Sequence, residues 1–215
     1  MKILITTGPT WEFIDPVRFI TSGSTGTLGV VIAKQFLKDK KNKVSIISGP
    51  VNVKFPQRCS VYKVVTAHEM YKCIKKIYKR YDVIIMSASV SDFKPLKYFK
   101  SKIKRENKKS ITIKLVRNPD ILSFVSKNKK THQILVGFSL ESHDLLTNTL
   151  KKYCNKKVDL IVANTVPAFG NAKINGYFIY DNTIMQFKNL SKLAVAKKIK
   201  ETVYQIFNLK RLGKR

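Results

Sequence analysis

The sequence predicts one α/β domain, with a Rossmann-like, doubly wound, mainly parallel sheet and helices on both of its faces. Short segments rich in Ile, Val and Thr alternate with segments whose apolar residues recur at helical spacing, and such alternation is typical of βαβ units. The run that follows Asp82 is apolar throughout, which is the pattern of a strand buried on both faces. The 215 residues contain no internal repeat and no Gly/Ser-rich or Pro-rich linker, so a single core accounts for the whole length.

Strands and helices are expected in alternation from the N-terminus onward. The strand segments are short and rich in β-branched residues; they are residues 2–7, 43–48, 61–65, 82–86, 111–115, 133–138 and 159–163. The helical segments carry apolar residues three and four apart; they are residues 28–37, 67–78, 121–127 and 143–156. The segment from Ser87 to Ser110 has no apolar periodicity and many lysines, so no element is predicted there.

The C-terminal part of the domain is expected to hold a small hairpin and a long helix. Residues 177–180 and 183–187 flank an Asp-Asn pair, which predicts two strands joined by a tight turn. Residues 191–207 have Leu193, Ile199, Val203 and Ile206 on one stripe, with Ser191 as the expected N-cap. The domain is therefore placed at residues 1–207, followed by a loose basic tail at residues 208–215.

The composition is extremely basic, with 42 Lys plus Arg, 13 Asp plus Glu and a net charge of +29. One interpretation is attraction to polyanions, either nucleic acid or a phosphorylated substrate. The other is a solvated, Lys-rich surface, because lysines are spread over nearly every predicted helix, as at Lys72, Lys75, Lys76 and Lys79. The charge alone does not decide between them.

The remaining composition argues against a transmembrane span, a signal peptide and a cysteine framework. No apolar run is long enough to span a bilayer, and the N-terminus lacks the pattern of a signal peptide. Three widely spaced cysteines without a C-x-x-C pair argue against a disulfide framework and a structural zinc site. We therefore expect a cytoplasmic protein.

Ligands of parallel sheets bind outside the carboxyl ends of the strands, so the loops after Thr7, Met86, Leu115, Phe138 and Ala163 are the expected site. The first of these loops carries glycines at 23, 26 and 29 and runs into a helix, a setting that favours phosphate. It matches neither G-x-G-x-x-G nor a P-loop. The same glycines would also serve to make the turn and pack helix on sheet.

Further candidates follow the later strands, and each has a structural alternative. Asp92 ends a run of small residues and either accepts hydrogen bonds from a ligand or caps a turn. Lys102 lies in a mobile basic stretch where it could meet developing negative charge. Phe138 either stacks on a base or belongs to the core. Lys152 and Lys156 share one helix face, which binds a ligand or is simply solvated. Asn118, Pro119, Asp120 and Ile121 form a good helix start as well as a possible site.

Taken together, these segments resemble phosphopantothenoylcysteine synthetase, the ligase of coenzyme A biosynthesis. The matching stretches, which include TGPT, IDPVRFI and NPDI, are collinear over almost the whole chain; they are residues 7–10, 14–20, 24–26, 48–50, 66–70, 88–92, 102–104, 118–121, 136–138 and 161–164. In many bacteria this domain follows a flavin-dependent decarboxylase. Because Met1 opens directly on the first strand, the sequence looks like a free-standing ligase without flavin.

The resemblance implies a two-step ligation. The carboxylate of 4′-phosphopantothenate attacks the α-phosphate of CTP to give an acyl-cytidylate, and the amine of L-cysteine then displaces CMP. It implies Mg²⁺ and no membrane partner, with nucleic acid disfavoured, and a homodimer formed through the segment after Asn164. The metal ligands are not indicated.

The resemblance also assigns roles to individual residues. Lys102 looks like the lysine needed for acyl-cytidylate formation, and Arg18 looks like a ligand of the phosphopantothenate end. The residues that look like nucleotide contacts are Ala88, Asp92, Lys102, Asn118, Pro119, Asp120, Ile121, Phe138, Lys152 and Lys156.

One departure from the family pattern concerns the second half-reaction. Ser22 stands where the family places an Asn, and a serine is shorter and lacks the amide. We expect the first half-reaction to be intact. In the second, either Ser22 or a water takes the place of the Asn, or turnover of the intermediate is slowed.

Three rival functions remain open at this point. A basic Rossmann-like protein that binds nucleic acid would bind in a strongly salt-dependent way. An NAD(P)-dependent reductase would share the sheet, but the glycine spacing disfavours it. A degenerate family member would bind phosphopantothenate without completing the ligation.

Overall fold

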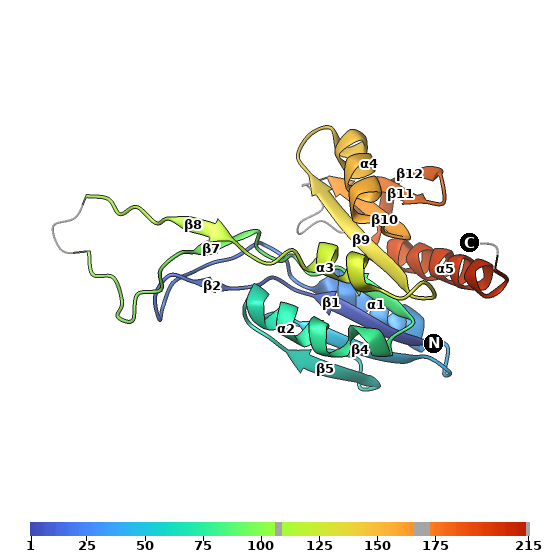
Figure 1. Cartoon of the computed structure of the whole chain (residues 1–215), viewed down its shortest axis with the longest axis horizontal. Helices are drawn as coiled ribbons and strands as arrows, with labels where there is room; N and C mark the ends of the chain where they lie inside the picture. The colour runs from blue at the N-terminus through green and yellow to red at the C-terminus, as the bar shows by residue number, and fades with distance from the viewer. Residues whose placement is uncertain (106–108, 166–172, 214–215) are drawn as a thin grey trace.

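The computed structural model describes residues 1–105, 109–165 and 173–213. One eight-stranded sheet runs through this described part of the chain (Figure 1). From one edge to the other its strands are β12 (Thr183–Ser191), β11 (Lys173–Tyr180), β10 (Leu160–Thr165), β9 (Ile134–Glu141), β6 (Val83–Met86), β1 (Lys2–Thr7), β4 (Lys43–Ser48) and β5 (Cys59–Lys63).

Neighbouring strands from β10 to β5 pair in parallel. Taken in chain order, these strands lie in the order 3-2-1-4-5-6, which is the Rossmann arrangement. The chain reverses its direction of travel across the sheet between β1 and β6, and this is the topological switch point. The predicted hairpin is present as β11 and β12, which pair antiparallel and extend the main sheet at one edge.

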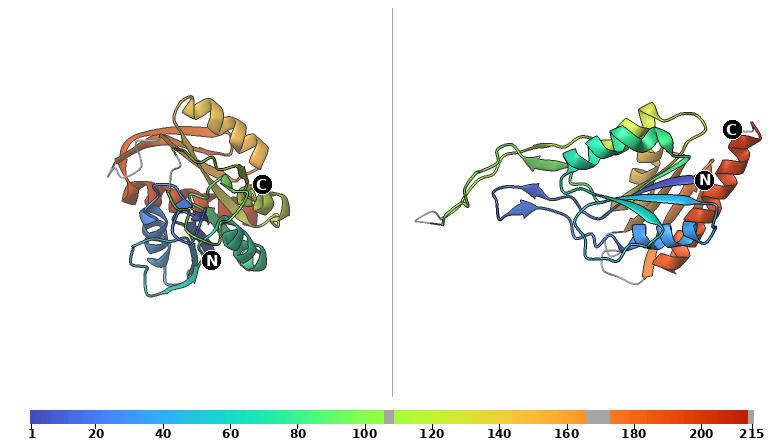
Figure 2. Two further views of the ribbon diagram at one scale, coloured as in Figure 1. Left: turned by 90° about the vertical axis from the view of Figure 1, so that its left-hand side faces the viewer. Right: turned by 90° about the horizontal axis from the view of Figure 1, so that it is seen from below.

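Helices cover both faces of the sheet, as predicted (Figure 2). One face carries α1 (Thr27–Leu37) and α5 (Lys192–Arg211), and the other carries α2 (Ala67–Ile77), α3 (Ile121–Asn128) and α4 (Leu145–Lys156). A short 3₁₀ turn at Tyr78–Arg80 follows α2.

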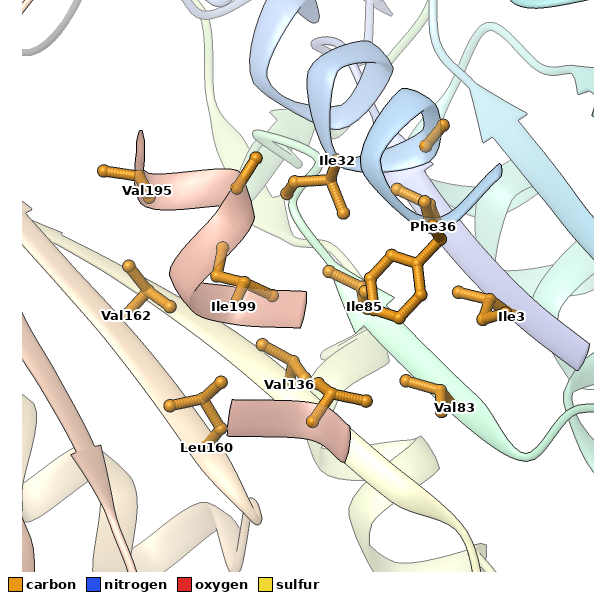
Figure 3. Packing of buried hydrophobic residues seen from close by; sticks show 14 of the residues in the cluster. Ile3, Ile32, Phe36, Val83, Ile85, Val136, Leu160, Val162, Val195 and Ile199 are labelled. Carbon is orange, nitrogen blue, oxygen red and sulfur yellow. The ribbon is translucent and has the colours of Figure 1, made fainter. Parts of the chain in front are cut away.

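The core lies between the sheet and each helix layer. On the α1 and α5 face, Ile32 and Phe36 of α1 and Ile199 of α5 are fully buried and face Ile85 and Val136 of the central strands (Figure 3). These helices bury β-branched and aromatic side chains at helical spacing, and this burial stabilises the layer.

The last helix is longer than expected, and its buried stripe begins at Val195, whereas Leu193, expected on that stripe, is exposed. Ser191 is its N-cap, as predicted, and its side chain accepts a hydrogen bond from the N–H of Ala194 at 3.1 Å. The helix then continues to Arg211, so residues 208–211 of the expected loose tail are helical. In this last turn, Lys210 forms an ion pair of 2.8 Å with the carboxylate of Asp159, which immediately precedes β10.

Three expectations about the middle of the chain were wrong in position. The third strand is Cys59–Lys63 instead of residues 61–65. The strand expected at residues 111–115 is β8 (Leu115–Arg117), which lies outside the main sheet and pairs with β7 (Phe93–Pro95). No strand was expected at β7. Both are short and only partly covered, so they lack the alternation by which strands are recognised.

These strands belong to an arm that projects from the sheet (Figures 1 and 2). The arm consists of two hairpin-like ribbons, β2 (Glu12–Phe13) with β3 (Phe19–Ile20), and β7 with β8. A hydrogen bond of 2.9 Å from the N–H of Phe99 to the carbonyl of Ile14 joins the two ribbons. The arm thus brings residues near 15 and near 100 together.

No helix in the part of the chain that the structure describes is long and apolar enough to cross a membrane.

Candidate functional site

Two adjoining cavities lie at the carboxyl ends of the parallel strands, at the topological switch point. The first cavity has a volume of ≈ 380 Å³ and includes Thr7, Gly26, Ser89 and Lys192 in its wall. The second cavity has a volume of ≈ 500 Å³ and includes Asn118. The two cavities share several wall residues, namely Ala88, Val90, Asp92, Phe138 and Lys152. Together they form one continuous site at the position where open α/β sheets bind ligands.

The first cavity is bounded by the start of α1, which lies directly over β1. Gly26 is the N-cap of α1 and has a φ of 73°, a left-handed conformation that glycine adopts without strain. Its carbonyl accepts a hydrogen bond of 2.8 Å from the hydroxyl of Thr7. A Cβ on Gly29 would lie 2.3 Å from Oγ1 of Thr7, so a glycine is needed for this close packing. Both predicted roles of the glycine-rich loop are therefore compatible with its geometry.

The loop after β6 forms the wall between the two cavities. The hydroxyl of Ser87 donates to the carbonyl of Thr6 at 2.6 Å, and the N–H of Ala88 donates to Oγ1 of Thr6 at 3.2 Å. These bonds tie the loop to the neighbouring strand β1. The small side chains that follow leave the backbone of this loop accessible to a flat ligand.

Asn118 connects that loop to the start of α3. Its N–H donates to the carbonyl of Asp92 at 2.8 Å, and its Nδ2 donates to the carbonyl of Ser91 at 2.9 Å. Residues that are 27 apart in the sequence are thereby held in one wall. The loop after Leu115 was expected to follow a strand of the main sheet. It follows β8 of the arm instead, and it reaches the site because the chain returns there from the arm to the sheet.

Asp120 and Lys156 lie in the second cavity as a bonded pair. Asp120 is the N-cap of α3, and its carboxylate accepts a hydrogen bond of 2.8 Å from the N–H of Ser123. Burial opposes ionisation of Asp120, but the bonds from Lys156 and Ser123 outweigh it and lower the pKa of the carboxyl. The helix begins at Ile121, as expected, so Pro119 lies just before the N-cap and outside the first turn. The carboxylate of Asp120 therefore has a structural role, as the N-cap of α3 and the partner of Lys156.

Lys152 lies at the junction of the two cavities. Burial lowers the pKa of its ammonium below the ordinary lysine value, and the nearby carboxylates of Glu141 and Asp92 oppose this shift. Phe138 lines both cavities beside it and also packs against the core. The site therefore offers a partly desolvated cation next to an aromatic ring.

The predicted site residues fall into two groups. One group lines the cavities and consists of Ala88, Asp92, Asn118, Pro119, Asp120, Ile121, Phe138, Lys152 and Lys156. The other group lies on the arm: Lys102 is exposed and lines neither cavity, and Arg18 donates a hydrogen bond of 2.7 Å to the carbonyl of Ile103. Ser22 lies between the groups, with its hydroxyl 3.4 Å from the carbonyl of Ser89.

Asp15 organises the arm around Arg18 and Lys102. Its fully buried carboxylate accepts hydrogen bonds of 2.8 Å from the N–H of Val17 and of Arg18 and one of 3.1 Å from the N–H of Ile103. Burial opposes ionisation, but these donors and the guanidinium of Arg18 together lower the pKa of Asp15. The peptide next to Lys102 is therefore held beside Arg18.

Carboxylates near the cavities are few. No group of three or more His, Cys, Asp or Glu side chains that could hold a metal occurs among the residues placed by the structure. Asp92 is exposed and lines both cavities. One such carboxylate suits Mg²⁺ that arrives with substrate phosphates, since this ion commonly keeps several waters and uses one or two protein carboxylates.

Sequence reasoning missed two basic residues of the site. Arg117 lines the second cavity and immediately precedes Asn118, so its position in the sequence was a usable signal. Lys192 lines the first cavity from the start of α5. No local pattern distinguishes it from the other lysines of this chain.

The chain is similar to proteins of known families over nearly its whole length. The family model for the DNA/pantothenate metabolism flavoprotein C-terminal domain matches residues 1–207. The protein named coenzyme A biosynthesis bifunctional protein CoaBC from Borreliella burgdorferi is 40% identical over 204 residues, which are 94% of this chain and 52% of the relative. The protein of the same name from Bacillus subtilis is 36% identical over 207 residues, 94% of this chain and 50% of the relative.

A solved structure supports the same relationship. The crystal structure of the C-terminal domain of a CoaBC protein superposes with a TM-score of 0.82 at 28% identity, covering 96% of this chain and 95% of that one. The chain spans about half the length of the curated relatives cited above. The similarity therefore concerns one domain of those proteins.

Proposed function

Because the chain belongs to the family of the DNA/pantothenate metabolism flavoprotein C-terminal domain, we propose that it is a phosphopantothenate–cysteine ligase of coenzyme A biosynthesis that uses CTP. The observation that carries the proposal is the continuous site at the switch point, in which Asp92, Asn118, Phe138 and Lys152 line adjoining cavities. Two cavities of this size suit a nucleotide next to a second substrate.

The proposed reaction activates a carboxylate and then transfers its acyl group. A carboxylate oxygen of 4′-phosphopantothenate attacks the α-phosphorus of CTP, and pyrophosphate leaves. The amine of L-cysteine next attacks the acyl carbon of the acyl-cytidylate, loses a proton and expels CMP. A mixed anhydride is required because a free carboxylate is a poor acyl donor to an amine.

The residues of the cavities suit this chemistry. Phe138 presents an aromatic face on which a base can stack. Lys152 is a partly desolvated cation whose charge is worth more to a phosphate than it would be in water. The first turn of α1, which follows Gly26, adds backbone N–H groups at the positive end of the helix. These groups orient the triphosphate and offset charge that develops on it.

We propose that Asp92 holds Mg²⁺ together with the phosphates of the nucleotide. When bound, the ion would neutralise phosphate charge. Asp92 is suited because it is exposed in both cavities, whereas Asp120 is already paired with Lys156.

The arm supports a proposal about assembly. Many of the exposed large apolar side chains lie on it, including Phe93, Leu96, Tyr98 and Phe99, and exposed patches of this kind mark interaction sites. We propose a homodimer formed through the arm, in which the arm of one copy brings Arg18 and Lys102 to the cavities of the other. The segment after Asn164, expected earlier as the interface, includes residues 166–172, which lie outside the described residues. We also propose that the protein is cytoplasmic, as expected from its sequence.

The test is an assay of the purified chain with 4′-phosphopantothenate, Mg²⁺ and each of the four nucleoside triphosphates, with and without L-cysteine. We expect pyrophosphate with CTP, and the amide product only when cysteine is present. Pyrophosphate without amide would indicate the degenerate alternative, in which Ser22 fails in the second half-reaction. Recovery of amide formation in Ser22→Asn would then identify the cause.

The same assay separates the ligase from a nucleic-acid-binding protein. Ligation should survive moderate salt, whereas binding to duplex or single strands would fall steeply as salt rises. Absence of pyrophosphate with every nucleotide would rule out the proposed function.

A further inference from the structure

Lys192 lies in the wall of the first cavity, in the first turn of α5, and no role has been given to it so far. Its side chain is half-buried. Among the residues that the structure describes, neither a salt bridge nor a side-chain hydrogen bond is found for Lys192. By contrast, the half-buried ammoniums of Lys129 and Lys156 each bind a carboxylate. A half-buried cation without a counter-charge loses hydration and gains little in return, so an anionic ligand would compensate it.

Several separate groups make the surroundings of Lys192 electrostatically positive. Lys152 reaches the same cavity from α4, with a pKa lowered by burial. The start of α1 faces the cavity at Gly26, with no side chain capping it and no acidic residue in its first turn. Asp92 is the one carboxylate among the wall residues of the first cavity in the described part of the chain. Two lysines and a helix N-terminus therefore surround a space that holds one acid.

The remaining wall supplies neutral donors that suit phosphate oxygens. Hydroxyls of Ser24, Thr25 and Thr27 line the cavity near the start of α1, together with Ser89 from the loop after β6. Phosphate oxygens accept several hydrogen bonds at once, and they bind most strongly to charged donors. Lys192 lines the same cavity from the start of α5, and α5 covers the same face of the sheet as α1 (Figure 2).

We propose that Lys192 binds a phosphate group of a substrate in the first cavity, as a residue for recognition that is additional to those named above. This inference rests on the proposed function for the identity of the substrate, and the phosphate could belong to the triphosphate of CTP or to 4′-phosphopantothenate. Lys192 anchors this group from the start of α5, which lines the same cavity as the start of α1.

The experiment measures dissociation constants of the native chain and of Lys192→Ala by calorimetry. The ligands are CTP, CMP, 4′-phosphopantothenate and inorganic triphosphate. We expect Lys192→Ala to raise the dissociation constant of at least one phosphate ligand by about tenfold, as for loss of one charge-assisted hydrogen bond. If CTP and inorganic triphosphate bind more weakly, and the dissociation constant of CMP changes by less than about twofold, Lys192 binds the β- or γ-phosphate of the nucleotide. If only 4′-phosphopantothenate binds more weakly, Lys192 binds the phosphate group of that acid.

The matched control is Lys197→Ala, which removes an exposed lysine from the same helix and the same net charge. It should leave all four dissociation constants unchanged, and Lys192→Arg should restore most of the affinity. If no phosphate ligand binds the native chain more tightly than Lys192→Ala, or if Lys197→Ala shows the same loss, the inference is wrong. The ligase assay is independent of this result, since a chain that binds phosphate through Lys192 and yields no pyrophosphate refutes only the proposed function.

Discussion

At the scale of single residues, Asp159 illustrates how this basic chain uses its few carboxylates. Its two oxygens bind Lys129 and Lys210, each at 2.8 Å, and one of them also accepts the N–H of Leu135 at 2.8 Å. Lys210 belongs to the last turn of α5, so the carboxylate fastens the C-terminal helix to the amino-terminal edge of the sheet. Burial raises the pKa of Asp159, but the two ammoniums outweigh it and hold the pKa below the ordinary value.

We predict that Asp159→Asn lowers the free energy of unfolding by about 3 kcal/mol at pH 7, because both lysines lose their counter-charge. The folded-state pKa is depressed, so the stabilisation is complete above the unfolded-state pKa, about 3.9. It is lost as the pH falls through the lower folded-state value. Urea titrations at pH 7 and at pH 3 would measure this, with a smaller difference expected at pH 3. Asp144→Asn, at an exposed position, should be neutral; an equal loss there would contradict the explanation.

At the scale of elements, the contact of α1 with β1 determines the shape of the first cavity. It depends on Gly29, since a Cβ there would lie 2.3 Å from Oγ1 and 2.5 Å from Cβ of Thr7. The hydroxyl of Thr7 is fixed by its bond to the carbonyl of Gly26. The helix would therefore have to move away from the strand to make room for a side chain.

We predict that Gly29→Ala destabilises the protein by about 1–3 kcal/mol, the usual cost of overpacking. Thermal unfolding of the native and variant chains would measure the change. The matched control is Gly137→Ala in β9, where the nearest atoms to an added Cβ are side chains at 3.4 Å. Equal losses at the two positions would show that the close contact with Thr7 is not the cause.

At the scale of the whole molecule, the arm and the sheet differ in how they are stabilised. The sheet is covered on both faces by helices, whereas the arm exposes apolar side chains such as Leu96, which is 56% exposed, and Tyr98, which is 50% exposed. The net charge of +29 opposes association of two copies. An arm-mediated dimer must therefore gain its stability from these apolar contacts.

We predict that the double variant Leu96→Ser, Tyr98→Ser converts a dimer to a monomer, as measured by sedimentation equilibrium. The control is Ile184→Ser, which changes a side chain of similar exposure, 48%, on the edge strand β12. Dissociation by the β12 variant alone would place the interface at that edge instead of the arm, and a native chain that is monomeric at all concentrations would contradict the dimer altogether.

Much of the architecture was predictable because it depends on local patterns. The apolar runs specify the central strands, and residues 2–7 and 43–48 form strands with the expected bounds. Ser191 caps the last helix as its hydroxyl and position suggest. The short strands of the arm were missed because they pair with each other in an exposed ribbon, where no face needs to be apolar. The extension of α5 to Arg211 was missed; its last turn contacts Asp159, which is far away in the sequence and gives no local signal.

By itself the sequence predicted the alternating elements, because hydrophobic periodicity acts through neighbouring residues. From that alternation it also predicted the carboxyl edge of the sheet as the place of the candidate site. Only the tertiary structure decided which of the many lysines share a cavity. It brought Lys152 and Lys192 together from different helices, and it put Lys102 on the arm. The physical reason is that a lysine's surroundings depend on the packing of distant segments, whereas its neighbours in the sequence are much alike throughout this chain.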